Sequence, residues 1–212
     1  MSKLTYEKTD SDNLLETFEW DRTWWSYAND NKTPRALFVG DSITCRYSPF
    51  VSDVVGDKIL VDSFSTSKAL DNPAFMPMVE MVMSQQSNYK IIVFNNGLHG
   101  FHLSEEEYGK WYGKRIKELR EKLPEVKLII SLTTPIRKGE NVSEIDDRNS
   151  RVTGRNAEAK KVAEEFGIET VDLYSLVIDK PEVFSHDGVH FLEAGYKLLA
   201  EKMGNTILKK IK

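Results

Sequence analysis

Five short apolar segments, separated by stretches with helical periodicity, are the feature that most constrains the fold of this chain. They cover residues 36–39, 58–61, 90–94, 127–132 and 169–173. Apolar strands that alternate with helices predict a mostly parallel sheet with helices on both faces. We therefore expect a three-layer α/β/α domain whose sheet has about five strands in the flavodoxin-like order 2-1-3-4-5.

The helical stretches carry their own start and stop signals. Ser104 and Glu107 have the spacing of a capping box, and Pro124 ends the helix that follows. A second apolar face ends at Phe166, where Gly167 is the expected residue just past the helix. A last helix is predicted from about Leu192 onward. The polar stretch 138–151 is predicted to be a long loop.

The first 34 residues precede the first predicted strand. We expect residues 1–34 to form an aromatic-rich extension packed on a single domain of residues 35–212. Three of the four tryptophans lie in this extension, at Trp20, Trp24 and Trp25. They are expected to fasten it to the domain, and the alternative is that Trp24 or Trp25 contacts substrate through its aromatic face.

Composition excludes several classes of partner. The chain has 212 residues with 29 Lys and Arg against 33 Asp and Glu, a net charge of −4, so nucleic acid is not an expected ligand. No apolar run has the length of a membrane span, and the N-terminus does not resemble a signal peptide. The single Cys45 suits a reducing compartment. These features predict a soluble, cytoplasmic protein that does not bind membranes.

Ser42 stands where a nucleophile is expected in such a sheet. It follows the first predicted strand in the sequence Gly40-Asp41-Ser42-Ile43. The glycine allows a sharp turn, and the helix that follows directs its N–H groups toward an anion beside the serine. Taken alone, a serine in this position would more often be the N-cap of that helix.

Other reactive side chains are expected to meet Ser42. Asn95 and Asn96 follow the third strand, which flanks the first strand in the predicted order, and an asparagine amide there can donate to a developing oxyanion. Asp187 precedes His190 by three residues near the C-terminus. A histidine can take the serine proton while an aspartate holds its other ring nitrogen.

Together these motifs resemble the SGNH, or GDSL-type, hydrolase family. Gly40-Asp41-Ser42, Val93-Phe94-Asn95-Asn96 and Asp187-x-x-His190 are similar to the family's first, third and last conserved blocks, in the same order. The resemblance implies that Ser42 is the nucleophile, with His190 as its base and Asp187 orienting that base. It also implies an oxyanion hole made by the Ser42 and Ser67 N–H groups and the Asn95 amide, with Asn96 as the alternative to Asn95.

The expected function is that of a serine esterase that cleaves small acyl esters, possibly on carbohydrates, through an acyl-enzyme. No cofactor is needed, and the expected partner is a small-molecule ester. Lysophospholipase, thioesterase and acyltransferase activities would use the same residues. A non-catalytic carbohydrate- or ligand-binding module with this fold is a different class of function. A nucleotide-binding protein is a weaker alternative, because no glycine-rich phosphate loop follows the first strand.

Three histidines admit a further interpretation. His99, His102 and His186 could share a metal, but no carboxylate or cysteine joins them at a usual ligand spacing. We therefore expect no metal site, with these side chains in loop packing or in contact with substrate. Asn96, His99 and Trp24 are the candidates for contact with substrate.

Overall fold

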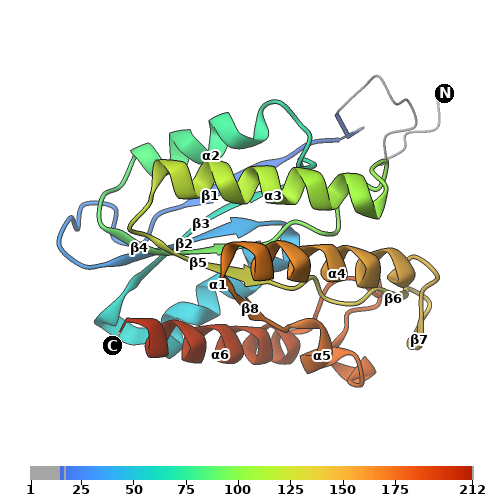
Figure 1. Ribbon diagram of the computed structural model, residues 1–212. Helices are drawn as coiled ribbons and strands as arrows, with labels where there is room; N and C mark the ends of the chain where they lie inside the picture. The colour runs from blue at the N-terminus through green and yellow to red at the C-terminus, as the bar shows by residue number, and fades with distance from the viewer. Residues whose placement is uncertain (1–14, 17, 212) are drawn as a thin grey trace.

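The main sheet contains the predicted order of parallel strands and one further strand at its edge. The structure is a computed structural model and describes residues 15, 16 and 18–211 (Figure 1). Its sheet has the order β1-β3-β2-β4-β5-β8. The strands are β1 (Asp21–Trp24), β2 (Arg35–Gly40), β3 (Leu60–Thr66), β4 (Tyr89–Phe94), β5 (Lys127–Ser131) and β8 (Glu169–Val171). All neighbours pair in parallel except β1 and β3, so the predicted order 2-1-3-4-5 is confirmed, with β1 added antiparallel to it.

Helices cover both faces of this sheet, as predicted. They are α1 (Ser42–Val55), α2 (Phe75–Ser84), α3 (Glu105–Lys122), α4 (Asn149–Phe166), α5 (Tyr174–Val177) and α6 (Glu193–Lys210). Figure 1 shows α1 and α6 on one side of the sheet and α2 and α3 on the other. Within residues 15, 16 and 18–211, none of the helices combines the length and apolar character needed to span a bilayer.

Strand β2 shows how the sequence builds the two cores. All six of its residues are buried. Because side chains alternate along a strand, Ala36 and Phe38 join the cluster under α1 and α6, while Leu37 and Val39 join the cluster under α2, α3 and α4. A strand that is apolar on both faces is typical of a parallel sheet covered on both sides.

The helix ends follow the expected chemistry, but the predicted loop at 138–151 is wrong. The capping box of Ser104 and Glu107 is present, and Gly167 ends α4 in the left-handed conformation with φ 63°. The supposed loop instead contains a hairpin of β6 (Arg137–Lys138) and β7 (Asn141–Ile145), and α4 begins at Asn149. The hairpin is mostly exposed and polar, so it lacks the apolar alternation that identifies a strand.

The N-terminal extension contributes to the sheet. Strand β1 pairs with β3 in a register that sets Asp21 opposite Thr66 and Trp24 opposite Ser63. Trp25 packs against the core under α2 and α3, whereas the Trp24 side chain remains exposed. Residues 1–14 and 17 of the predicted extension lie outside the described residues. Trp25 therefore helps to fasten the extension to the domain, whereas the Trp24 side chain does not.

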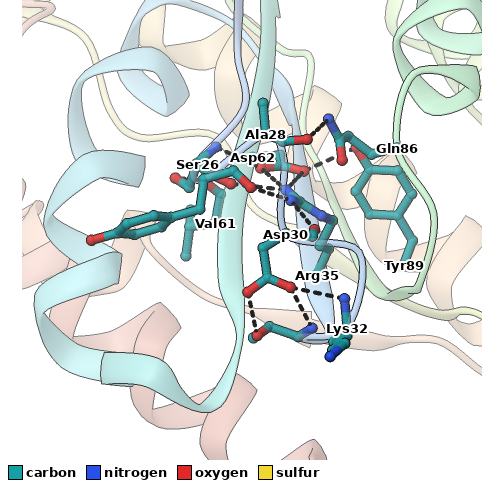
Figure 2. A network of polar contacts seen from close by, with 11 residues as sticks. Ser26, Ala28, Asp30, Lys32, Arg35, Val61, Asp62, Gln86 and Tyr89 are labelled. Carbon is teal, nitrogen blue, oxygen red and sulfur yellow. Dashed lines mark hydrogen bonds and ion pairs between the residues drawn. The ribbon is translucent and has the colours of Figure 1, made fainter.

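A buried ion pair anchors the connection between β1 and β2 (Figure 2). One guanidinium nitrogen of Arg35 lies 2.9 Å from both carboxylate oxygens of Asp62, and both side chains are 0% exposed. The Tyr89 hydroxyl donates to the same carboxylate at 3.0 Å. Arg35 also donates to three backbone carbonyl oxygens of the connection, those of Ser26, Tyr27 and Asp30. The guanidinium therefore fixes the path of this loop.

Candidate active site

The turn between β2 and α1 presents the Ser42 hydroxyl. A Cβ atom on Gly40 would lie 2.2 Å from Thr44 Oγ1, so the turn has room only for glycine at this position. The buried Asp41 carboxylate accepts hydrogen bonds from the N–H groups of Ile43 and Thr44 and is the N-cap of α1. Because Asp41 caps the helix, the interpretation of Ser42 as the N-cap is wrong, and its hydroxyl has a different partner.

That partner is His190, from the turn before α6. The Nε2 atom of His190 lies 2.9 Å from Ser42 Oγ, and its Nδ1 atom lies 2.7 Å from Asp187 Oδ2. A carboxylate can only accept, so the Nδ1 nitrogen carries the shared hydrogen and Nε2 has a lone pair for the serine hydroxyl. The structure thus brings together the three side chains that the sequence separates by as many as 148 positions.

The Asp187 carboxylate is held by its own turn. Its Oδ1 atom accepts from the Ser185 hydroxyl at 2.8 Å and from the N–H groups of Val189 and His190 at 2.9 and 2.8 Å. Partial burial raises the pKa of Asp187, but the hydrogen bonds from His190, Val189 and Ser185 outweigh it and lower that pKa below its ordinary value. The carboxylate is therefore ionised throughout the neutral range.

The hairpin of β6 and β7 supports this turn from behind. The Arg137 N–H donates to the Gly188 carbonyl at 2.7 Å. Gly188 has φ 73°, and a Cβ atom there would lie 2.0 Å from the Arg137 carbonyl oxygen. The buried Arg137 side chain donates to the carbonyls of Val142 and Ile178. Arg137 is therefore a supporting residue of the site.

The two asparagines after β4 point to different neighbours. Asn95 Nδ2 donates to the Ser131 carbonyl at 2.7 Å and to Thr133 Oγ1 at 3.1 Å, both just past or at the end of β5. Asn96 is fully buried, and its Nδ2 donates to the Lys68 carbonyl at 2.9 Å. Asn96 therefore braces the loop after β3 and does not line an open surface, contrary to its expected contact with substrate.

The structure does not support the prediction that the Ser67 N–H is an oxyanion donor. Its N–H already donates to the Trp20 carbonyl at 3.1 Å, and its Oγ accepts from the Trp20 N–H at 2.9 Å. This reciprocal pairing continues the β1–β3 ladder past the end of both strands. The Ser67 N–H is therefore already hydrogen-bonded to the N-terminal extension. The sequence did not reveal that the extension pairs with β3.

A buried arginine fixes the loop after Asn96. Arg155 is 0% exposed and donates to the carbonyls of Gly97, His99 and Gly100 at 3.1, 2.7 and 2.7 Å. Its guanidinium carbon lies 4.3 Å from the centroid of the Phe101 ring. Burial lowers the pKa of Arg155 to about 10, which keeps it charged at neutral pH. No sequence signal singles it out, because an arginine inside a helix is usually on the exposed face.

The histidines that suggested a metal lie in unlike settings. The His99 ring meets the Trp20 ring edge-on, with centroids 6.4 Å apart, and burial lowers the pKa of His99 despite the nearby Asp41 and Glu16 carboxylates. The His102 Nε2 atom lies 2.8 Å from Asp71 Oδ2, whereas His186 is exposed. In the part of the chain that the structure describes, no group of three or more potential metal ligands gathers.

The family assignment rests on a match over more than half of the chain. Residues 91–203 match the model of the family described as GDSL-like Lipase/Acylhydrolase. The chain belongs to this family. Its members hydrolyse ester bonds, so the resemblance found in the motifs is confirmed, as is the expectation of a hydrolase. The matched span of this GDSL-like protein includes Asn95, Asp187 and His190, whereas Ser42 precedes it.

Solved structures confirm the fold of this GDSL-like hydrolase. A member of the lipolytic G-D-S-L family from Veillonella parvula is 18% identical, with a TM-score of 0.67 over 84% of this chain and 100% of the other. A carbohydrate acetylesterase from Sinorhizobium meliloti is 13% identical, with a TM-score of 0.67 over 84% and 99% of the two chains. An acetyl xylan esterase is 18% identical, with a TM-score of 0.65 over 82% and 99%. No curated protein sequence matches the chain.

Proposed function

We propose that this protein is a serine esterase that removes small acyl groups, acetyl above all, from carbohydrate esters. One observation carries the catalytic part of the proposal. A continuous chain of hydrogen bonds, 2.9 Å and 2.7 Å long, joins Ser42 Oγ to His190 and His190 to Asp187. A serine next to a histidine whose other nitrogen is held by a carboxylate is the arrangement that activates a hydroxyl for acyl transfer.

The reaction follows from these contacts. Ser42 Oγ attacks the ester carbonyl carbon while its proton moves to His190 Nε2. The tetrahedral intermediate collapses as the C–O bond to the alcohol breaks, and the alcohol oxygen takes the proton from His190. Water then attacks the acyl-serine with His190 again as base, which releases the acid and restores Ser42. Ionised Asp187 stabilises the imidazolium that forms in each half.

The oxyanion needs donors at the start of α1. The Ser42 N–H has no intrahelical acceptor because it belongs to the first turn, and the positive end of the helix lies beside it. Asn95 supplies the second donor in this proposal. Asn95 Nδ2 makes the shorter of its two hydrogen bonds to the Ser131 carbonyl, and this bond holds the amide in place. The second N–H of the amide exchanges its hydrogen bond to Thr133 Oγ1 for one to the oxyanion. Catalytic hydrogen bonds often form fully only with substrate present.

One comparison supports a small acyl group on a carbohydrate. Solved structures of similar fold include a carbohydrate acetylesterase and an acetyl xylan esterase. The proposal extends their chemistry to this chain.

A panel of esters tests the proposed substrate class. With p-nitrophenyl esters from acetate to palmitate, kcat/KM is expected to be highest for acetate to butyrate and to fall with longer chains. Acetylated oligosaccharides are expected to release acetate. Lysophosphatidylcholine and acyl-CoA thioesters complete the panel. A clear preference for palmitate, for the lysolipid or for a thioester would contradict the proposal.

The two asparagines allow a matched comparison of roles. Asn95→Ala is expected to lower kcat by about 10²- to 10³-fold, the usual effect of losing one oxyanion donor. Asn96→Ala is expected to lower the free energy of unfolding by about 1–3 kcal/mol, because a buried carbonyl of Lys68 loses its donor, and to change kcat by less than about tenfold. Steady-state kinetics on p-nitrophenyl acetate and urea denaturation measure both. The reverse pattern would assign the donor to Asn96.

A further inference from the structure

A groove runs along the side of α1 that faces away from α6. The Val54 side chain of α1 packs against Gly204 of α6, because a Cβ atom built on Gly204 would lie 2.6 Å from that side chain. Cys45 is nine residues from Val54, which places it on the opposite side of a helix with 3.6 residues per turn. On that side α1 borders the edge strand β1 and its neighbour β3, and a cavity of about 780 Å³ lies between the helix and these strands.

One end of this groove lies about one helical turn along α1 from Ser42, which does not itself line it. Cys45 lines the groove one helical turn after Ser42, and Arg22 of β1 donates to its sulfur at 3.3 Å. Arg22 lies opposite Ser65 of β3, which in turn lies opposite Gly40 in the turn before Ser42. The lining continues along α1 to Gly56, which is about 16 Å farther. The groove therefore leads away from the active site along one helix.

The walls of the groove combine aromatic faces with polar groups. Trp24 and Tyr27 line it and are 57% and 75% exposed, although large aromatic side chains are usually buried. Arg22, Asp53 and Asp57 line it as well, and all three are exposed. Apolar ring faces next to carboxylates and a guanidinium suit a ligand that has both C–H faces and many hydroxyls. An acyl chain would remove the carboxylates from water with no hydrogen bond in return.

Tyr27 is held in an unusual conformation at the groove wall. Its φ is 45°, a left-handed value that is uncommon for an aromatic residue. The Arg35 guanidinium keeps it there by a 2.9 Å hydrogen bond to the Tyr27 carbonyl, and Arg35 is itself held by Asp62. Residues in strained conformations that are held in place by their surroundings cluster at ligand-binding positions. The buried ion pair thus builds a rigid wall of this groove.

We propose that this groove binds the carbohydrate chain of the substrate, with the esterified sugar at Ser42 and the neighbouring sugars stacked on Trp24 and Tyr27. The inference rests on the proposed esterase function for the identity of the reaction. The ligand class is a neutral oligosaccharide, because the carboxylates of Asp53 and Asp57 would repel an anionic polymer.

Kinetics on long and short substrates test the groove. Trp24→Ala is expected to raise KM for an acetylated xylo-oligosaccharide by about five- to tenfold and to leave kcat/KM for p-nitrophenyl acetate within twofold. Trp24→Phe should restore most of the affinity. Met81→Ala is the control, because Met81 is an exposed apolar residue of α2, on the other side of the sheet. Equal loss on both substrates, or a selective loss on p-nitrophenyl palmitate, would overturn the proposal.

Binding without catalysis separates this inference from the proposed function. Calorimetry on the Ser42→Ala protein uses three non-acetylated neutral probes, xylohexaose, cellohexaose and chitohexaose. At least one should bind saturably, and Trp24→Ala in the same background should weaken that binding by about tenfold. If no ester is hydrolysed but an oligosaccharide binds here, the proposed esterase fails and the groove remains a carbohydrate site. If none of the three binds, the groove proposal is wrong whatever the esterase activity.

Discussion

Ser42→Ala is expected to lower kcat for p-nitrophenyl acetate by about 10⁵- to 10⁶-fold, which is the scale on which serine hydrolases lose activity with their nucleophile. The physical reason is that, among the residues the structure describes, Ser42 Oγ is the only hydroxyl hydrogen-bonded to His190. Ser42 Oγ lies 2.9 Å from His190 Nε2, and the protein without it has a base but no nucleophile to deprotonate. Residual hydrolysis would come from bound water and the remaining oxyanion donors.

Covalent labelling gives the same test a second measurement. A fluorophosphonate probe should modify the wild-type protein once and the Ser42→Ala variant not at all. Ser84→Ala is a suitable control, because Ser84 ends α2 and its hydroxyl donates to the Met81 carbonyl and accepts from Gln85 Nε2, with no histidine beside it. Ser42→Ala combined with His190→Ala should be no slower than either single change, because the two side chains act as one unit. Labelling that persists in Ser42→Ala would assign the nucleophile elsewhere.

Asp62→Ala is expected to lower the free energy of unfolding by about 3–5 kcal/mol, since it leaves the buried Arg35 guanidinium without its counter-ion. Both side chains are 0% exposed, so water cannot solvate the remaining charge. The change also deprives the Ser26 N–H and the Tyr89 hydroxyl of their acceptor. Urea denaturation followed by circular dichroism measures the loss.

Two further variants show whether the buried charge is the cause. Replacing both partners, as Arg35→Met with Asp62→Leu, should cost less than Asp62→Ala alone because no unpaired charge remains. Lys117→Ala removes an exposed pair in which the Lys117 Nζ and Glu121 Oε1 atoms are 4.0 Å apart, and should cost less than about 1 kcal/mol. A double variant that is as unstable as Asp62→Ala would show that packing, and not charge, accounts for the loss.

Sequence patterns predicted the parts of the fold that are apolar or locally signalled. Four of the five parallel strands are buried along most of their length, and β8 is the partly exposed strand at the edge. Their apolar composition identifies these strands, and their connections determine their order. Strand β1 was not predicted because Asp21 to Trp24 is short, polar and mostly exposed, and only its pairing with β3 makes it a strand. The hairpin at Arg137–Ile145 was missed for the same physical reason.

At the candidate site, sequence spacing predicted which side chains take part. It did not predict the other residues that compete for their hydrogen bonds. Ser42, Asp187 and His190 were chosen by chemical type and topology, and the structure brings these atoms within hydrogen-bond distance. The Ser67 N–H was assigned to the oxyanion because nothing in the sequence showed that Trp20 would pair with it. The buried positions of Arg137 and Arg155 depend on tertiary packing, which local periodicity does not report.

The edge position of β1 has a consequence for how the enzyme's specificity can change. Strand β1 touches the rest of the sheet only through β3, and the parallel core is complete without it. Substitutions at its exposed residues Arg22 and Trp24 can alter one wall of the groove and leave the residues around Ser42 as they are. A library confined to this strand would vary substrate range at little risk to folding or chemistry, which makes β1 the natural place to evolve new activities.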